Sequence, residues 1–353
     1  MKKQIAFSLV LALVLSLLAG CTGTAVVYYG DCTCPTGSHT PTEPTNPSTP
    51  PAEGAVKTGL AFITNVSESA SGVQAKYDVT LVAVTVDDKG VIDQCIIDSI
   101  GTNVTFDATG TITADLNADI LSKNELGDNY GMVQYGGAKY EWYQQAAALA
   151  DYAEGKTVEQ LKNGAIDETG KAPAGSDLAS TATIYLGGYV SAIEVAVNNA
   201  KNLGAQAGDE LRLAAISSIA SSTSATAEKN GTAQLDVDVT ALTVKDGVIT
   251  SCYIDSVQAK VTFDTTGTVT SDITAAVKTK NELGDSYGMV AWGGAKHEWY
   301  VQAANFASYV TGKTAAEVAG IAVSQGKPSD ADLSAGVTIA IGGFQALIAK
   351  ALQ

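Results

Sequence analysis

Residues 77–100 read YDVTLVAVTVDDKGVIDQCIIDSI, and this stretch decides the fold. Apolar and polar side chains alternate along two runs, which is typical of strands that bury one face. Asp88, Lys89 and Gly90 lie between the runs and form a turn sequence. The stretch therefore predicts a β-hairpin.

The same pattern occurs a second time. Residues 237–244 and 248–257 alternate in the same way around the turn at Lys245, Asp246 and Gly247. The next segment is duplicated even more closely: KNELGDNYGMVQYGGAKYEWY at 123–143 matches KNELGDSYGMVAWGGAKHEWY at 280–300, with 17 of 21 positions identical at an offset of 157 residues. A repeat of this length indicates an internal duplication. We expect two homologous domains, at residues 55–204 and 209–353.

The later part of each copy has helical periodicity. Apolar residues recur at spacings of three and four over residues 141–154, and further helices are expected over 192–203 and 346–352. Strands followed by helices predict an α+β fold, with an antiparallel sheet and helices in each copy. Cys95 and Cys252 fall at equivalent apolar positions of the strands, where cysteine is usually a core residue.

The amino-acid composition predicts a folded protein and argues against nucleic acid as its partner. Of the 353 residues, 46% are hydrophobic and 16% are charged, so a packed core is expected despite a formal net charge of −16. Arg212 is the only arginine, and acidic groups outnumber basic ones by 37 to 21. Phosphate backbones require clustered Lys and Arg, so nucleic acid is excluded as a partner.

The N-terminus predicts export and a lipid anchor. Lys2 and Lys3 precede an apolar run over residues 5–18, and the L-A-G-C that ends at Cys21 resembles the lipobox of bacterial lipoproteins. We expect residues 1–20 to be a signal peptide and Cys21 to carry lipid, with cleavage and plain secretion as the alternative. Residues 35–51 hold six of the eight prolines, so residues 21–54 are expected to form the lipidated N-terminus and an extended tether.

Catalytic and metal sites are not expected. His39 lies in the tether and His297 aligns with Tyr140, so the copies share no histidine that could act as a base or a metal ligand. Duplicated carboxylates occur at Asp128, Asp285, Glu141 and Glu298, and helix capping and solvation explain these as well as acid–base chemistry does.

A doubled motif near the end of each copy suggests a covalent cofactor. Residues 177–183 read DLASTAT and residues 332–338 read DLSAGVT, and each leads through a Gly-Gly pair into a helix. This resembles the D-x-x-[ST]-G-A-T signal on which a flavin transferase attaches FMN to threonine. The resemblance implies Thr183 and Thr338 as acceptors, with Asp177 and Asp332 as motif residues. Helix caps and turns use similar patterns, and both copies depart from the signal in the residues between Asp and Thr.

Together with the doubled ELGDxYGMV, GGAKxEWY and YxxGKT segments, this motif resembles the FMN-binding lipoproteins of Gram-positive bacteria over essentially the whole mature chain. The resemblance implies two covalent FMN groups, a transferase that adds them, and a membrane quinone and NADH dehydrogenase system as electron source. It implies acceptors such as ferric iron outside the cell. The chain would be a lipid-anchored electron carrier on the extracellular face of the cell membrane, and not an enzyme in its own right.

Two further expectations accompany this resemblance. Residues 13–20 are similar to peptide pheromones released from lipoprotein signal sequences in this family. The duplicated aromatic residues Tyr130, Trp142, Tyr287 and Trp299 are candidates for stacking on the flavin, with core packing as the alternative. The competing function is a surface binding or adhesion lipoprotein of two tandem α+β domains without a cofactor.

Overall fold

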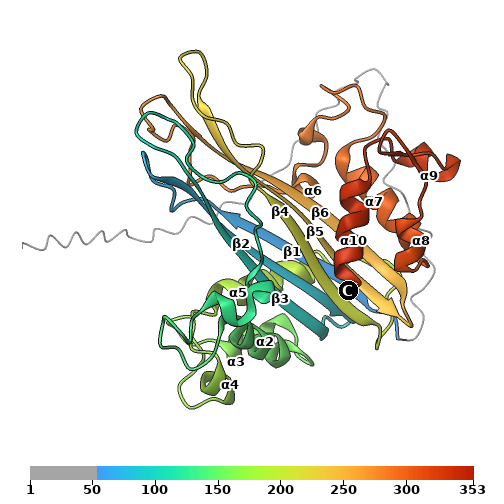
Figure 1. The fold of residues 1–353 in the computed structure, drawn as a ribbon. Coiled ribbons are helices and arrows are strands. Elements are labelled where there is room, and N and C mark those ends of the chain that lie inside the picture. The colour runs from blue at the N-terminus through green and yellow to red at the C-terminus, as the bar shows by residue number, and fades with distance from the viewer. Residues whose placement is uncertain (1–53) are drawn as a thin grey trace, which may run out of the picture. The chain divides into compact units, whose positions relative to one another are not determined.

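The computed structural model describes residues 54–353, which belong to one compact unit (Figure 1). The predicted signal peptide, the predicted lipidation site at Cys21, the candidate pheromone segment and nearly all of the predicted tether lie outside the described residues. Within the described residues, no helix is both long enough and apolar enough to cross a membrane.

Similar series of elements occur in the two halves of the described chain, with one additional pair of short strands in the second half. We call residues 54–209 the first repeat and residues 210–353 the second repeat. The first repeat contains β1 (Lys57–Asn65), β2 (Gln74–Val86), β3 (Ile92–Thr105), α1 (Lys123–Leu126), the 3₁₀ helix η1 (Gly127–Tyr130), α2 (Trp142–Ala153), α3 (Val158–Ala165), α4 (Asp177–Thr181) and α5 (Gly187–Asn198). The second contains β4 (Glu210–Ser218), β5 (Gly231–Lys245), β6 (Val248–Phe263), α6 (Lys280–Leu283), η2 (Gly284–Tyr287), α7 (Trp299–Val310), α8 (Ala315–Ala319), β7 (Val323–Ser324), β8 (Lys327–Pro328), α9 (Ala331–Gly336) and α10 (Gly342–Ala351).

The α+β class and the two hairpins are confirmed. Each repeat has a three-stranded antiparallel sheet, β1-β2-β3 or β4-β5-β6, and the predicted hairpins are β2-β3 and β5-β6. The expected helices differ in their bounds. Helix α5 begins at Gly187 and α10 at Gly342, because each Gly-Gly pair forms the first turn of its helix and does not precede it.

Successive side chains along each strand lie on opposite faces of the sheet, so they pack in two different hydrophobic cores. In β2, Leu81 and Ala83 belong to a core that both sheets share, whereas Val82 and Val84 pack under the helices of their own repeat. In the second repeat, Ala241 faces the shared core and Leu242 faces α7 and α10. The order is therefore helices, sheet, sheet, helices, and Figure 1 shows α2–α5 and α7–α10 on opposite sides of the strands.

The sheets also meet along their edges. The Thr58 hydroxyl on β1 lies 2.6 Å from the Ser251 hydroxyl on β6. Beside β3, the Gln94 side chain donates to the Asp209 carbonyl oxygen at 2.6 Å and accepts from the Leu211 N–H at 3.0 Å. Side-chain hydrogen bonds thus close both edges of the shared core.

Reciprocal contacts join the loop after β3 to the β4–β5 loop, and the loop after β6 to the β1–β2 loop. The Ser224 hydroxyl accepts from the Ile112 N–H at 2.9 Å, and the Ser71 hydroxyl accepts from the Val269 N–H at 3.0 Å. Beneath these loops the rings of Phe106 and Phe263 stack, with 4.0 Å between centroids and 5° between planes. Each repeat makes the same contacts to the other, as in a twofold dimer interface.

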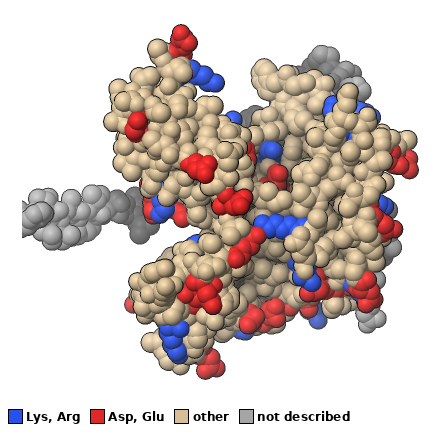
Figure 2. Space-filling view, viewed as in Figure 1, with Lys and Arg blue, Asp and Glu red and all other residues tan. Residues whose placement is uncertain are grey.

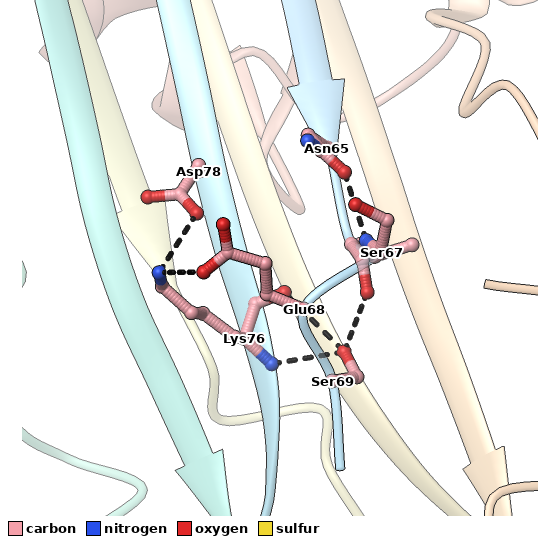
Figure 3. A network of polar contacts seen from close by, with 7 residues as sticks. Asn65, Ser67, Glu68, Ser69, Lys76 and Asp78 are labelled. Atoms are coloured by element: carbon pink, nitrogen blue, oxygen red, sulfur yellow. Dashed lines mark hydrogen bonds and ion pairs between the residues drawn. The ribbon is translucent and has the colours of Figure 1, made fainter. Parts of the chain in front are cut away.

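The connection from β1 to β2 has its own polar network (Figure 3). Lys76 pairs with Glu68, and its Nζ lies 3.4 Å from Asp78 Oδ2. The Ser69 hydroxyl accepts from the Lys76 N–H at 3.0 Å and donates to the Val66 carbonyl oxygen at 2.7 Å. This network fixes the loop beside the strand ends that meet the second repeat.

The shared core predicts that both repeats unfold together. Phe263→Ala should lower the free energy of unfolding by about 3–5 kcal/mol, because it removes a fully buried ring and its stacking contact with Phe106. Urea unfolding followed by circular dichroism and by tryptophan fluorescence should give coincident transitions for the native chain and for the variant. Val323→Ala, at an exposed valine, is the control and should change little. Two separate transitions in the native chain would contradict the prediction.

Candidate functional site

Both candidate acceptor threonines lie in a short loop that follows a short helix. Thr183 lies between α4 and α5, and Thr338 lies between α9 and α10. Thr183 is exposed and Thr338 is half-buried. Each threonine precedes the first residue of the next helix by four positions, so its backbone leads directly into the helix N-terminus.

A buried glutamine holds each threonine. The Gln145 side-chain oxygen on α2 accepts from the Thr183 N–H at 2.8 Å, from the Thr183 hydroxyl at 3.1 Å and from the Ile184 N–H at 3.1 Å. The Gln145 amide nitrogen donates to the Tyr140 carbonyl oxygen at 2.9 Å. The glutamine side chain is fully buried and every polar group on it has a partner.

The second repeat has the same arrangement. The Gln302 side-chain oxygen on α7 accepts from the Thr338 N–H at 2.8 Å, from the Thr338 hydroxyl at 3.2 Å and from the Ile339 N–H at 3.2 Å. The hydroxyl proton is directed inward to the amide in both copies. The lone pairs of the hydroxyl oxygen are therefore free to face outward.

A duplicated glutamate anchors a second loop at the same helix end. The Glu141 carboxylate accepts from the Met132 N–H at 2.8 Å and the Val133 N–H at 2.9 Å. Glu298 binds the Met289 and Val290 N–H groups at 2.8 and 2.9 Å. Both carboxylates are buried at the N-cap positions of α2 and α7, so these duplicated acids have a structural role in the fold.

A lysine joins the two loops. Lys139 Nζ donates to the Ser180 carbonyl oxygen at 3.4 Å, and Lys296 Nζ donates to the Ala335 carbonyl oxygen at 3.0 Å. Both lysine side chains are exposed. Each copy thus has a cation at the C-terminal end of the helix that precedes the acceptor threonine.

The motif aspartates are exposed and lie in the first turns of α4 and α9. The side chains that cap these helices come from the preceding residues, Ser176 and Asp330. Asp177 and Asp332 place negative charge near helix N-termini, where it is favourable. Their carboxylates are open to solvent and to a modifying enzyme.

The aromatic candidates divide into buried and partly exposed residues. Trp142 and Trp299 are 3% and 5% exposed and pack in the helix-covered cores. Trp142 Nε1 also donates to the Tyr189 hydroxyl at 3.1 Å. Lys123 and Lys280 lie over these indole rings and over Tyr130 and Tyr287 as well. Core packing accounts for both tryptophans.

Sequence reasoning missed Gln145, Gln302, Lys139 and Lys296 as parts of the site. The available signal was their conservation between the two copies, at the offset of 157 residues. Their partners on the threonine loops were not recognisable, because they lie 36 to 41 residues further along the chain.

The described residues contain no cluster of three or more His, Cys, Asp or Glu side chains suited to a metal ion. Cys95 and Cys252 are buried core residues, as predicted. Burial raises the pKa of the Cys95 thiol and raises that of Cys252 to about 12. Both thiols therefore stay protonated and unreactive at neutral pH.

Comparison with known proteins found no matching family model, no matching curated protein and no matching solved structure.

A buried aspartate on β6 gives the fold a pH dependence. Burial raises the pKa of Asp255 to about 6, although its carboxylate accepts from the Ser256 N–H at 2.7 Å and the Asn281 N–H at 3.1 Å. The equivalent Asp98 pKa is raised for the same reason. The folded protein therefore retains this proton at pH values where the unfolded chain has lost it.

This difference predicts that Asp255 makes the protein less stable as pH rises from about 4 to about 6. Asp255→Asn cannot ionise, so its free energy of unfolding relative to the native chain should increase by about 1–3 kcal/mol over that interval. Urea unfolding at pH 4, 5, 6 and 7 measures the trend. Glu228→Gln, in an exposed loop, is the control and should show no such trend. A constant difference for Asp255→Asn would contradict the assignment.

Proposed function

We propose that the chain is a lipid-anchored electron carrier with two covalently attached FMN groups, one on Thr183 and one on Thr338, held in two homologous FMN-binding domains. The observation that carries the proposal is the doubled threonine site. In both copies a threonine ends the flavinylation-like motif, and a buried glutamine accepts a hydrogen bond from its hydroxyl.

The side chains around each threonine are suited to a phosphoester. When a threonine oxygen bonds to the flavin phosphorus of a flavin dinucleotide, the bond to the nucleoside monophosphate breaks, and the transferase takes the hydroxyl proton. The product carries one negative charge on its phosphate. Lys139 and Lys296 lie close to the threonine loops and can pair with that charge. The backbone N–H groups at the start of α5 and α10 favour an anion as well.

The glutamine suits both the free and the modified threonine. Before modification its oxygen accepts from the hydroxyl and from two backbone N–H groups. After modification the hydroxyl proton is gone, but the two N–H groups still bind the same oxygen. The loop can therefore keep its conformation when flavin is attached. The flavin itself supplies the reversible electron chemistry, and the protein holds and orients it.

The two sites belong to different layers. Gln145 and Thr183 lie among helices that cover the β1-β2-β3 sheet, and Gln302 and Thr338 lie among helices that cover the β4-β5-β6 sheet. Both sheets separate these helical layers. In our proposal each flavin therefore exchanges electrons with partners at its own face: a membrane quinone and NADH dehydrogenase system as donor, and extracellular acceptors such as ferric iron.

The surface is compatible with an exported carrier. Most of the face in Figure 2 is uncharged, with acidic side chains spread over it. The net charge of −16 favours solubility and weak attraction of cationic complexes. Lipidation of Cys21 would keep the carrier at the extracellular face of the cell membrane.

Intact-mass spectrometry tests the flavin attachment directly. The native chain co-expressed with an FMN transferase should carry two FMN adducts, and Thr183→Val and Thr338→Val should each remove one. Valine retains the volume of threonine but has no nucleophilic oxygen. Thr181→Val, two residues before the first acceptor, is the matched control and should retain both adducts. A colourless protein of unmodified mass would refute the proposal and favour the cofactor-free surface module.

Gln145 is predicted to be a positioning residue for the modification. Gln145→Leu should slow flavin attachment at Thr183 by about fivefold to tenfold, because both hydrogen bonds that orient the acceptor, from the Thr183 N–H and from its hydroxyl, are lost. Attachment at Thr338 should be unchanged and provides an internal control. Gln144→Leu removes the neighbouring glutamine, which caps α2 without contacting the threonine. Equal slowing in both variants would show that only helix stability matters.

A further inference from the structure

Two aromatic side chains are displayed to solvent at equivalent positions. Trp292 is 89% exposed and Tyr135 is 81% exposed, the highest values among large hydrophobic side chains of the described residues. The two positions are 157 residues apart, as in the rest of the duplicated segment. Single exposed apolar side chains are common on protein surfaces, but here an exposed aromatic ring occurs at the same position of both copies.

The turns that end at these rings, residues 131–135 and 288–292, have the same backbone conformation. Gly288 and Gly131 have φ values of 82° and 81°, which glycine adopts readily. A Cβ atom at either glycine would collide with the Trp292 or Tyr135 ring, so the glycine also makes room for the ring. The backbone N–H of Trp292 donates to the Gly288 carbonyl oxygen at 2.9 Å, and the backbone N–H of Tyr135 donates to the Gly131 carbonyl oxygen at the same distance.

The turn is fastened to the helix that holds the acceptor threonine. Glu298 binds the N–H groups of Met289 and Val290, and Gln302, one helical turn later on α7, binds Thr338. One turn corresponds to roughly 6 Å along the helix axis. Lys296 connects the same turn to α9. Trp292 and Thr338 are thus presented at one end of α7, and Tyr135 and Thr183 at one end of α2.

We propose that Trp292 and Tyr135 are the stacking platforms for the isoalloxazine rings of the FMN groups on Thr338 and Thr183. This inference rests on the proposed function. The ribityl chain separates the isoalloxazine from the phosphate, so the ring must find a surface some distance from the threonine. A planar, exposed side chain on a firmly held turn provides that surface, whereas Trp142 and Trp299 are buried in the cores.

The two platforms are not equivalent. The second repeat has an indole at position 292, and the residue two positions after its acceptor is Ala340. The first repeat has a phenol at position 135, and the corresponding residue is Tyr185, which is 60% exposed and lies against Gly170 and Gly187. The second repeat therefore has one exposed aromatic side chain where the first has three, Tyr130 included, so the second repeat is the simpler place for a test.

Flavin fluorescence measures the contact, because stacking on an indole quenches the excited flavin. We would use Thr183→Val as the parent, since it carries flavin on Thr338 alone, and add Trp292→Ala. The flavin quantum yield should increase severalfold while intact mass still shows one adduct. Tyr135→Ala in the same parent is the matched control, and it should leave the quantum yield unchanged because its own site is empty.

The outcomes separate this inference from the proposed function. An adduct whose fluorescence is unchanged by Trp292→Ala would overturn the platform and leave the covalent flavin intact. A parent without any adduct would overturn both. Because Trp292 is almost fully exposed, its replacement should not alter the melting temperature by more than a degree or so, and a large shift would show that the side chain has a structural role instead.

Discussion

Each three-stranded sheet has two apolar faces, and the helices of its own repeat cover only one of them. Leu81 and Val82 are neighbours on β2, and both are fully buried, yet they face different cores. The uncovered face must be removed from water by some other surface. The equivalent sheet of the other repeat provides it, and the stacked rings of Phe106 and Phe263 are part of that contact. The whole architecture depends on this pairing of two sheets.

The pairing has a direct consequence for the sites. Because the inner face of each sheet is buried in the shared core, that face offers no solvent-accessible site, and the candidate sites lie on the helical side of each repeat. The candidate acceptor loops of Thr183 and Thr338 accordingly lie against α2 and α7. Two copies of one site are thereby held apart on a single rigid support. The edge contacts from Thr58 and Gln94 keep that support closed.

Within each site, one neutral side chain does most of the positioning. A glutamine oxygen can accept from several donors without the cost of burying a charge. Gln145 and Gln302 therefore orient the threonine loops from inside the helical layer, while the charged Lys139 and Lys296 remain at the surface. Glu141 and Glu298 are buried acids, and each is stabilised by two backbone N–H groups. In our proposal, the neutral glutamine beside each threonine and the exposed lysine near it suit a site for a phosphate.

The hairpins and the candidate threonines could be predicted from the sequence alone. The alternation and the turn at Asp88 to Gly90 predicted the hairpin, the duplication predicted a second one, and the repeated motif singled out Thr183 and Thr338. Only the tertiary structure decided what each side chain faces. Trp292 and Trp299 lie seven residues apart, yet Trp292 is exposed to solvent and Trp299 is buried in the core. Partners such as Gln145 and Thr183 meet because the chain folds back over 38 residues, and no local pattern encodes such a contact.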